Sequence, residues 1–403
     1  MGAPSITIFR GDTSRLRNTI SISERVTPAF HDQERRKIFA RAWLPVASVA
    51  DVPVKGSYIV VEVPPMKTSL LVVRGDDGKV RAFHNVCRHR GDRLVYLGQG
   101  KDLGCRKAFT CGFHGWTYNN VGKLIGVTDE SQFVGLDKGK HALIPVHTEE
   151  WESLVFVNFD EQPRETLRDW LGDFYDQYKG IGAGREKIAD YRVVLKTNWN
   201  IAVNAFQEGY HNIYIHRNTV PDYQGSNENP QRHRPYMEVG RHFGRYSAHA
   251  NFDHQQTPAE SVIYKHTRRM FPSFSKVDPE TLPPGVNPSR FPEWAFDIVH
   301  MFPHFMLGPQ ANTHTHMWFW PIDHEHTEIR RQIYAYKAQT PADRVGHAYS
   351  KVRAREVIRE DLATMEASLA AISSGALPHI VLSQQEMLVQ NHYRAADDML
   401  AEE

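Results

Sequence analysis

The first part of the chain contains four short runs of strand-forming residues: SYIVVEV (57–63), TSLLVVR (68–74), KVRAFHNV (79–86) and SLVFVNF (153–159). They are rich in Val, Ile, Leu and Phe, and turn-forming stretches such as Gly75-Asp76-Asp77-Gly78 separate them. Short runs of this kind, bounded by Gly, Asp and Asn, are typical of antiparallel strands joined by tight turns. We therefore expect a small antiparallel β domain over residues 43–160.

The remaining residues, 1–42 and 161–403, mix amphipathic helices with longer strands, so the whole chain is predicted to be an α+β protein. The expected helices cover 166–178, 199–216 and 341–373, and the expected strands cover 191–196, 313–321 and 328–337. The Pro- and Gly-rich stretch 278–293 is expected to form a long surface loop.

Charge and cysteine content exclude several classes of function. Lys and Arg number 48 against 47 Asp and Glu, and this balance predicts no nucleic-acid or anionic-membrane partner. No run approaches the roughly 18 apolar residues of a membrane-spanning helix. Three cysteines cannot form a fully paired disulfide framework, so we expect a cytoplasmic protein. The 22 His and the many aromatic residues suggest metal binding and an apolar pocket.

Two pairs of potential metal ligands lie in the β domain. Cys87 and His89 form the first pair, Cys111 and His114 form the second, and Trp116 follows closely. Two thiolates and two imidazoles can bind either a [2Fe–2S] cluster of mixed ligation or a tetrahedral zinc ion. A zinc finger usually carries its ligands on a hairpin and a helix. Both pairs here follow predicted strands, which favours the iron–sulfur cluster.

The predicted helix 199–216 carries a second constellation, formed by Glu208, His211 and His216. On an ideal helix two residues five apart point about 140° away from each other. Both histidines can therefore reach one metal only if the helix bulges or breaks near 212–215. Glu208 is placed to hold the second N–H of His211. From these residues alone, two partly buried structural histidines remain an alternative.

The two constellations, in this order along the chain, resemble the Rieske non-haem iron oxygenases, in particular the alpha (terminal oxygenase) subunits of the aromatic-ring-hydroxylating enzymes. The resemblance covers nearly the whole chain. It implies a Rieske domain at 43–160 and a catalytic domain formed by 1–42 and 161–403. That second domain is expected to hold an antiparallel sheet packed by helices, of the helix-grip or START-like kind.

One feature departs from the family pattern. The gap between His89 and Cys111 holds 21 residues, a few more than usual. Cys105 lies inside this gap, but Ala108 stands where its histidine would have to be. We interpret residues 101–107 as an enlarged loop and Cys105 as a bystander thiol, half-buried as a small hydrophobic residue.

The resemblance assigns cofactors to these residues. It implies a Rieske [2Fe–2S] cluster bound by the two Cys/His pairs and shielded by Trp116. It also implies a mononuclear Fe(II) bound by His211, His216 and a carboxylate from a late helix. We choose Asp361 as this carboxylate and expect the neighbouring Glu360 to be solvated.

Two further residues are expected to act near the iron. In the family an acidic residue links the second Rieske histidine of one subunit to an iron ligand of its neighbour, which here would join His114 to His211 through Glu208. Aspartate is more common at this position, and glutamate occurs in some branches, including oxygenases of quaternary amines. Asn204 is expected to form a hydrogen bond near the iron. The implied assembly is a ring of three subunits.

The substrate pocket is expected to be apolar, with these candidate residues: Phe206, Tyr210, Phe302, Phe305, Met306 and Trp318. His314 and His316 are expected at the surface or in the pocket wall.

The implied function is O₂ activation and hydroxylation of a hydrophobic aromatic or alicyclic substrate in aromatic compound catabolism. Electrons would come from a ferredoxin or an NAD(P)H-dependent reductase. Three alternatives remain: oxygenation or demethylation of a quaternary ammonium compound, a Rieske electron-transfer protein without catalysis, and a zinc-stabilised ligand-binding protein.

Overall fold

The computed structural model of the protein describes residues 7–223, 225, 229–251, 253–267 and 278–402. The chain divides into two compact units, one of residues 39–169 and the other of residues 1–38 with 170–403. The predicted Rieske domain, 43–160, falls within the first. Among the described residues, no helix is both long enough and apolar enough to span a bilayer.

The unit of residues 39–169 is built from antiparallel sheets, as predicted. Among the described residues its larger sheet has the strand order β3-β12-β11-β6-β5-β4-β7, and its smaller sheet has the order β10-β9-β8. The strands of the larger sheet are β3 (Leu44–Ser48), β4 (Ser57–Val63), β5 (Thr68–Arg74), β6 (Val80–His84), β7 (Leu103–Cys105), β11 (Pro145–Trp151) and β12 (Leu154–Asn158). Those of the smaller sheet are β8 (Ala108–Thr110), β9 (Thr117–Asn119) and β10 (Leu124–Gly126).

The enlarged loop of residues 101–107 forms the edge strand β7. This strand pairs with β4, so that Cys105 lies opposite Ser57. The Cys105 side chain is exposed rather than half-buried as expected, because it lies at the sheet edge. The residues of this loop therefore extend the larger sheet by one edge strand.

The second unit is organised around a sheet of eight described strands in the order β1-β14-β15-β16-β17-β18-β19-β13. Neighbouring strands pair antiparallel, except that β1 and β14 are parallel. The strands are β1 (Ile8–Arg10), β13 (Arg185–Leu195), β14 (Tyr236–Val239), β15 (Phe243–His249), β16 (Trp294–Met301), β17 (Phe305–Pro309), β18 (Thr313–Pro321) and β19 (Thr327–Tyr336). A separate ribbon pairs β2 (Thr19–Ser21) with β20 (His379–Val381).

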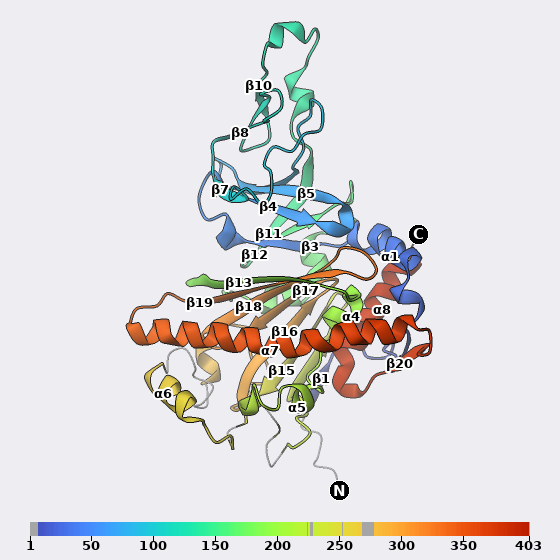
Figure 1. Ribbon diagram of the computed structural model, residues 1–403, viewed down its shortest axis with the longest axis vertical. Coiled ribbons are helices and arrows are strands. Elements are labelled where there is room, and N and C mark those ends of the chain that lie inside the picture. The colour runs from blue at the N-terminus through green and yellow to red at the C-terminus, as the bar shows by residue number, and fades with distance from the viewer. Residues whose placement is uncertain (1–6, 224, 226–228, 252, 268–277, 403) are drawn as a thin grey trace. The chain divides into compact units, whose positions relative to one another are not determined.

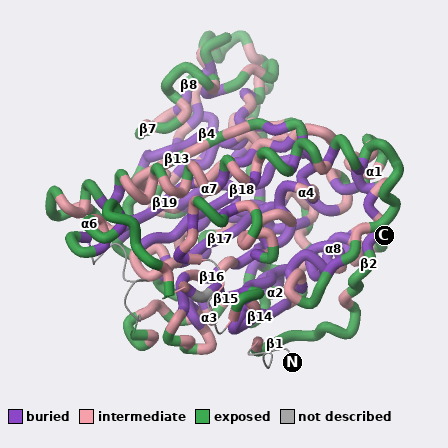
Figure 2. Tube along the Cα trace, turned by 60° about the horizontal axis from the view of Figure 1, so that its bottom comes forward, coloured by how far each residue is buried: buried purple, intermediate pink, exposed green. Residues whose placement is uncertain are grey.

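Several helices contact this sheet, and the mixture of helices and antiparallel strands confirms the predicted α+β class. The described helices of the chain are α1 (Pro28–Glu34), α2 (Leu167–Leu171), α3 (Phe174–Gln177), α4 (Trp199–Asn204), α5 (Asn212–Ile215), α6 (Pro258–His266), α7 (Pro341–Ser373) and α8 (Met387–Ala401). The long helix α7, orange in Figure 1, runs along the sheet. In Figure 2 strands β15 to β18 are largely buried, whereas α6 is mostly exposed.

Helix α7 covers the predicted range because its start is well defined. Thr340 accepts a hydrogen bond from the N–H of Asp343 (3.1 Å), the Asp343 side chain accepts from the N–H of Thr340 (3.0 Å), and Pro341 occupies the first helical position. This reciprocal cap satisfies N–H groups that a helix start leaves free. The cap thus fixes the register of the residues that α7 carries.

Two predicted helices are interrupted. The segment 166–178 forms the short helices α2 and α3, separated by Gly172 with a φ of +55°. The segment 199–216 forms α4 and α5, separated by an irregular stretch from Ala205 to His211. Residues 278–293 form the expected loop, with one short helical turn at Pro279–Thr281.

Candidate metal centres and substrate cavity

The two Cys/His loops of the smaller unit have the same backbone geometry. In the first, the N–H of Gly91 donates to the carbonyl of Cys87 (3.0 Å), and in the second the N–H of Gly115 donates to the carbonyl of Cys111 (3.0 Å). Both glycines have positive φ values, +83° and +76°, which favour glycine over other residues. Each loop is therefore a tight turn that carries one thiol and one imidazole.

The four side chains fit a mixed-ligand cluster. Cys87 and Cys111 are free thiols that are 2% and 3% exposed, whereas His89 and His114 are partly exposed. The two imidazole rings lie 4.6 Å apart between centroids, and His89 stacks on Trp116 at 4.9 Å. The buried Nδ1 of His89 has no hydrogen-bond partner among the residues that the structure describes. Because a buried nitrogen without a partner is costly, this atom is available as a metal ligand.

The second candidate site depends on the break between α4 and α5. Glu208 folds back so that its Oε2 accepts hydrogen bonds from the N–H groups of Tyr210 and His211, the latter at 3.2 Å. These two contacts hold the irregular segment that precedes α5. The break thus falls between Asn204 and Asn212, earlier in the chain than the predicted 212–215, which form the short helix α5 with His211 and His216 at its two ends.

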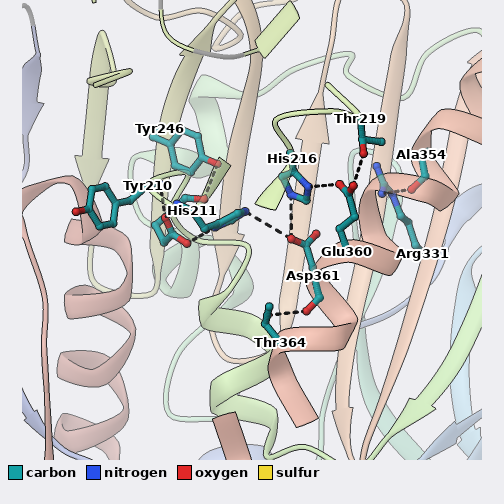
Figure 3. A network of polar contacts seen from close by, with 11 residues as sticks. Tyr210, His211, His216, Thr219, Tyr246, Arg331, Ala354, Glu360, Asp361 and Thr364 are labelled. Atoms are coloured by element: carbon teal, nitrogen blue, oxygen red, sulfur yellow. Dashed lines mark hydrogen bonds and ion pairs between the residues drawn. The ribbon is translucent and has the colours of Figure 1, made fainter. Parts of the chain in front are cut away.

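The structure brings His211, His216 and Asp361 together. One ligand atom from each lies within 4.8 Å of the others. The Nε2 of His216 is 2.9 Å from the Oδ1 of Asp361, and the Nε2 of His211 is 3.5 Å from the same oxygen. Figure 3 shows both rings turned toward Asp361, which comes from α7. Two imidazoles and one carboxylate converging on one point match the donor set that binds Fe(II) and leaves open positions.

A carboxylate holds the other nitrogen of each histidine. The Nδ1 of His211 donates to Glu208, and the Nδ1 of His216 donates to the Oε2 of Glu360 at 2.8 Å. Such contacts fix the tautomer and ring orientation, so that both Nε2 atoms are left as ligands. The site therefore consists of three donors and two orienting carboxylates.

These contacts also shift pKa values. Burial alone would raise the pKa of Glu208, but the hydrogen bond and charge of His211 lower it below its usual value. Burial alone would lower the pKa of His216, but the hydrogen bonds and charges of Asp361 and Glu360 raise it.

Glu360 was predicted to be solvated, and this prediction is wrong. Its side chain turns toward His216 and also accepts a hydrogen bond from the hydroxyl of Thr219 (Figure 3). Its partner His216 lies 144 positions away in the sequence, so no local pattern could have indicated the contact.

The three donors open onto a cavity of about 200 Å³ in the same unit. Its wall is formed by α5, α7 and the strands β15 to β19, and includes Phe206, Tyr223, Phe296, Thr315, Met317, Arg331 and Arg353. Glu208, His211, His216 and Asp361 also line it. A ligand in this cavity would therefore lie directly beside the three donors.

Of the six pocket candidates, the structure places Phe206 in the cavity wall and the other five elsewhere. Tyr210 is 57% exposed, and Phe302 packs against His242. Phe305 and Trp318 are paired across β17 and β18 and pack against each other, on the face of the sheet opposite Met317. Met306 is buried but does not line the cavity.

His314 and His316 lie on the same sheet face as Trp318. Both are buried, and both pack against Tyr334, so neither lies at the surface or in the cavity wall as expected. Asn204 donates through its Nδ2 to the hydroxyl of Tyr393 on α8 (2.8 Å) and does not line the cavity. The expected hydrogen bond of Asn204 near the metal is therefore replaced by a contact with α8.

The chain belongs to the family of ring-hydroxylating alpha subunits. Residues 182–402 match the family described as the ring hydroxylating alpha subunit (catalytic domain), and residues 42–146 match the Rieske [2Fe–2S] domain. The protein accordingly carries a Rieske [2Fe–2S] domain and a catalytic domain of the kind that uses mononuclear Fe(II).

Individual relatives fall into two groups. A glycine betaine monooxygenase oxygenase subunit from Chromohalobacter salexigens is 31% identical over 56% of this chain and 48% of its own length. A biphenyl 2,3-dioxygenase subunit alpha from Rhodococcus jostii is 33% identical over 45% of this chain and 40% of its own length. The chain thus matches about half or less of these two relatives.

The fold matches solved structures over nearly their full length. A quaternary ammonium Rieske monooxygenase in complex with an inhibitor superposes with a TM-score of 0.74 at 20% identity, covering 94% of this chain and 95% of the other. This likeness establishes the shared fold of the two proteins.

Proposed function

We propose that the protein is the terminal oxygenase component of a Rieske oxygenase system, and that it oxygenates a small organic substrate held in the cavity. The convergence of His211, His216 and Asp361 on a cavity wall supports this proposal most directly. When bound, the cluster would supply single electrons, and the Fe(II) would supply the centre at which O₂ reacts.

Each ligand residue has a defined part in this proposal. Cys87, His89, Cys111 and His114 would bind the cluster, and Trp116 would keep water from His89 by stacking on it. His211, His216 and Asp361 would bind the iron. Glu208 and Glu360 would hold the two imidazoles in the orientation that presents Nε2.

The same proposal includes partners and assembly. Electrons would come from a ferredoxin or an NAD(P)H-dependent reductase, and the subunits would form a trimer. In that trimer Glu208 would accept a hydrogen bond from His114 of a neighbouring subunit while it holds His211. The cluster thiols must remain reduced, which is consistent with the expected cytoplasmic location.

For the substrate we favour a ring compound over a quaternary ammonium compound. Two tyrosines of the cavity wall already have arginines over one face: Arg353 lies 5.0 Å from the ring centre of Tyr223, and Arg234 lies 4.9 Å from that of Tyr246. Cationic groups at these rings oppose the binding of a second cation there. The similarity to betaine and carnitine monooxygenases keeps the quaternary ammonium reading as the second candidate.

The decisive variant is Asp361→Ala. We expect it to lose the mononuclear iron and product formation, by roughly 100-fold or more, while the visible absorption of the cluster is kept. Glu356→Ala is the matched control, because Glu356 lies on the same helix and pairs with Arg359 away from the cavity. Iron content, absorption spectrum and product mass are measured with a reductase. Full turnover by Asp361→Ala would favour a Rieske electron-transfer protein, and zinc in place of iron would favour a zinc-stabilised binding protein.

A further inference from the structure

Arg331 places a positive charge in the cavity wall. It lies on β19, opposite Met317 of β18 and Tyr191 of β13. Its neighbours on the same face of β19, Ile329 and Ile333, are apolar, and Ile333 lines the cavity with it. A charged side chain within this apolar row is costly unless something compensates for the charge.

Within the part of the chain that the structure describes, Arg331 has little compensation. Its Nη1 donates to the carbonyl of Ala354 at 3.1 Å, while among the described residues its Nε has no hydrogen-bond partner and no carboxylate forms an ion pair with it. A guanidinium carries five N–H donors, so most of them are unused. Figure 3 shows the contact with Ala354, which holds the guanidinium against α7.

Two neighbouring arginines show the contrast. Arg353, which also lines the cavity, forms an ion pair with Asp222 and donates to the hydroxyl of Tyr264 (3.2 Å). Arg330, next to Arg331 on the opposite face of β19, donates twice to Asp190, at 3.0 and 2.7 Å. Arg331 therefore differs from both, because none of the described residues forms an ion pair with it.

The acidic residues of the cavity do not supply this partner. Glu208 is engaged with His211, and Asp361 with both histidines. The charge of Asp361 does raise the pKa of Arg331, but burial lowers it more, so the net shift is downward. A divalent cation bound by Asp361 would offset the negative charge of that residue and leave Arg331 as an uncompensated cation.

We propose that Arg331 binds an anionic group of the substrate, a carboxylate or a sulfonate, and so selects ring compounds that carry one such substituent. This inference rests on the proposed oxygenase function, because it takes the cavity beside the three donors as the substrate site. Both groups present two oxygens that can accept a pair of hydrogen bonds from one guanidinium.

The test measures binding to the purified full-length protein by calorimetry, with benzoate, benzenesulfonate and benzamide as probes. The wild type is expected to bind the two anions at least about 10-fold more tightly than the neutral amide. Arg331→Met, which keeps an unbranched apolar side chain but removes the guanidinium, is expected to weaken anion binding about 10- to 100-fold and to change benzamide binding less than about 2-fold. If Arg331→Met is not folded, Arg331→Lys is used instead. Its affinities for benzoate and benzenesulfonate should fall, but less than those expected of Arg331→Met.

Arg330→Met is the matched control, because it removes a positive charge one residue away on the other sheet face, and it should leave all three affinities unchanged. Equal affinities for benzoate and benzamide in the wild type would overturn the proposal. The proposal would also be overturned if Arg331→Met lowered the iron content and the affinities for the anions and for benzamide together. Arg331 would then stabilise Asp361 and the metal site rather than bind a ligand. Oxygenase function is tested separately by product formation in Asp361→Ala, so failure of either proposal can be recognised.

Discussion

The two candidate metal sites hold their histidines in different ways. In the smaller unit each imidazole belongs to a tight turn, and the turn is closed within five residues by a Gly N–H that donates to a Cys carbonyl. In the larger unit His211 and His216 are held by carboxylates, and Glu360 and Asp361 come from a helix far along the chain. The first kind of site depends on local backbone geometry, and the second depends on the fold.

The largest expected effect comes from a variant that removes one metal centre and keeps the other. Cys111→Ser should abolish the visible absorption of the cluster and product formation, because a serine hydroxyl is a poor replacement for a thiolate. Mononuclear iron should remain bound. Cys105→Ser is the matched control, since this exposed thiol lies on β7 and should alter neither spectrum nor turnover. Loss of both metals in Cys111→Ser would contradict the independence of the two sites.

Glu360→Ala tests whether the larger unit needs its orienting carboxylate. Loss of the contact with the Nδ1 of His216 frees the ring to turn, and the affinity for iron should fall about 10- to 100-fold. The measurement is a competition titration with a chelator, and Glu356→Ala on the same helix gives the reference. Unchanged affinity would mean that α7 and Asp361 fix His216 without help.

A pH dependence tests the long-range contacts at the start of α4. Buried Glu34 accepts hydrogen bonds from the Nε1 of Trp199 (2.9 Å) and the Nδ2 of Asn200 (2.8 Å), and burial raises the pKa of Glu34 to about 7. Between pH 4.5 and 7 the folded protein therefore keeps a proton that the unfolded chain releases. As the pH rises from 4.5 to 7, the free energy of unfolding should therefore fall by about 3 kcal/mol.

The Glu34→Gln variant has no ionisable group at this position, so its free energy of unfolding should depend less on pH. Chemical denaturation of both proteins at pH 4.5 and pH 8 measures the difference. An identical pH dependence in the two proteins would show that Glu34 ionises in the folded state as readily as in the unfolded chain.

The smallest expected effect compares the two cluster loops with each other. An added Cβ at Gly91 would meet no atom within 4 Å, whereas one at Gly115 would lie 2.4 Å from the Oγ1 of Thr128. Gly91→Ala should cost about 1–2 kcal/mol for its positive φ, and Gly115→Ala should cost more by roughly 1–3 kcal/mol. In a Thr128→Ala background the two costs should become similar, as measured by denaturant unfolding.

The sequence predicted those parts of the protein that depend on neighbouring residues. The spacing of Cys87 and His89 was visible because both ligands lie in one turn, and helix α7 was located because its cap is local. Glu360 was missed because its partner is distant. The break before α5 was placed too late, since it depends on the way Glu208 folds back onto His211.

The pocket was predicted less well, for a geometric reason. Side chains alternate between the two faces of a strand, so that on β18 Thr315 and Met317 face the cavity and Trp318 faces away. Aromatic content pointed to Trp318 and Phe305, but these residues pack against each other on the other face. A shift of one residue is enough to reverse such an assignment.

Helix α7 has a consequence for how members of this family diversify. Ser350, Arg353, Ala354, Val357 and Asp361 lie along one stripe of the helix and all line the cavity. Substitutions at Ser350, Ala354 and Val357 would alter the cavity wall while the helical backbone keeps Asp361 in place, whereas Arg353 is tied to Asp222. An insertion of one residue within this stripe would rotate Asp361 by about 100° and destroy the site. Natural variation in substrate preference should therefore accumulate as substitutions along this stripe, and length changes should be confined to the ends of the helix.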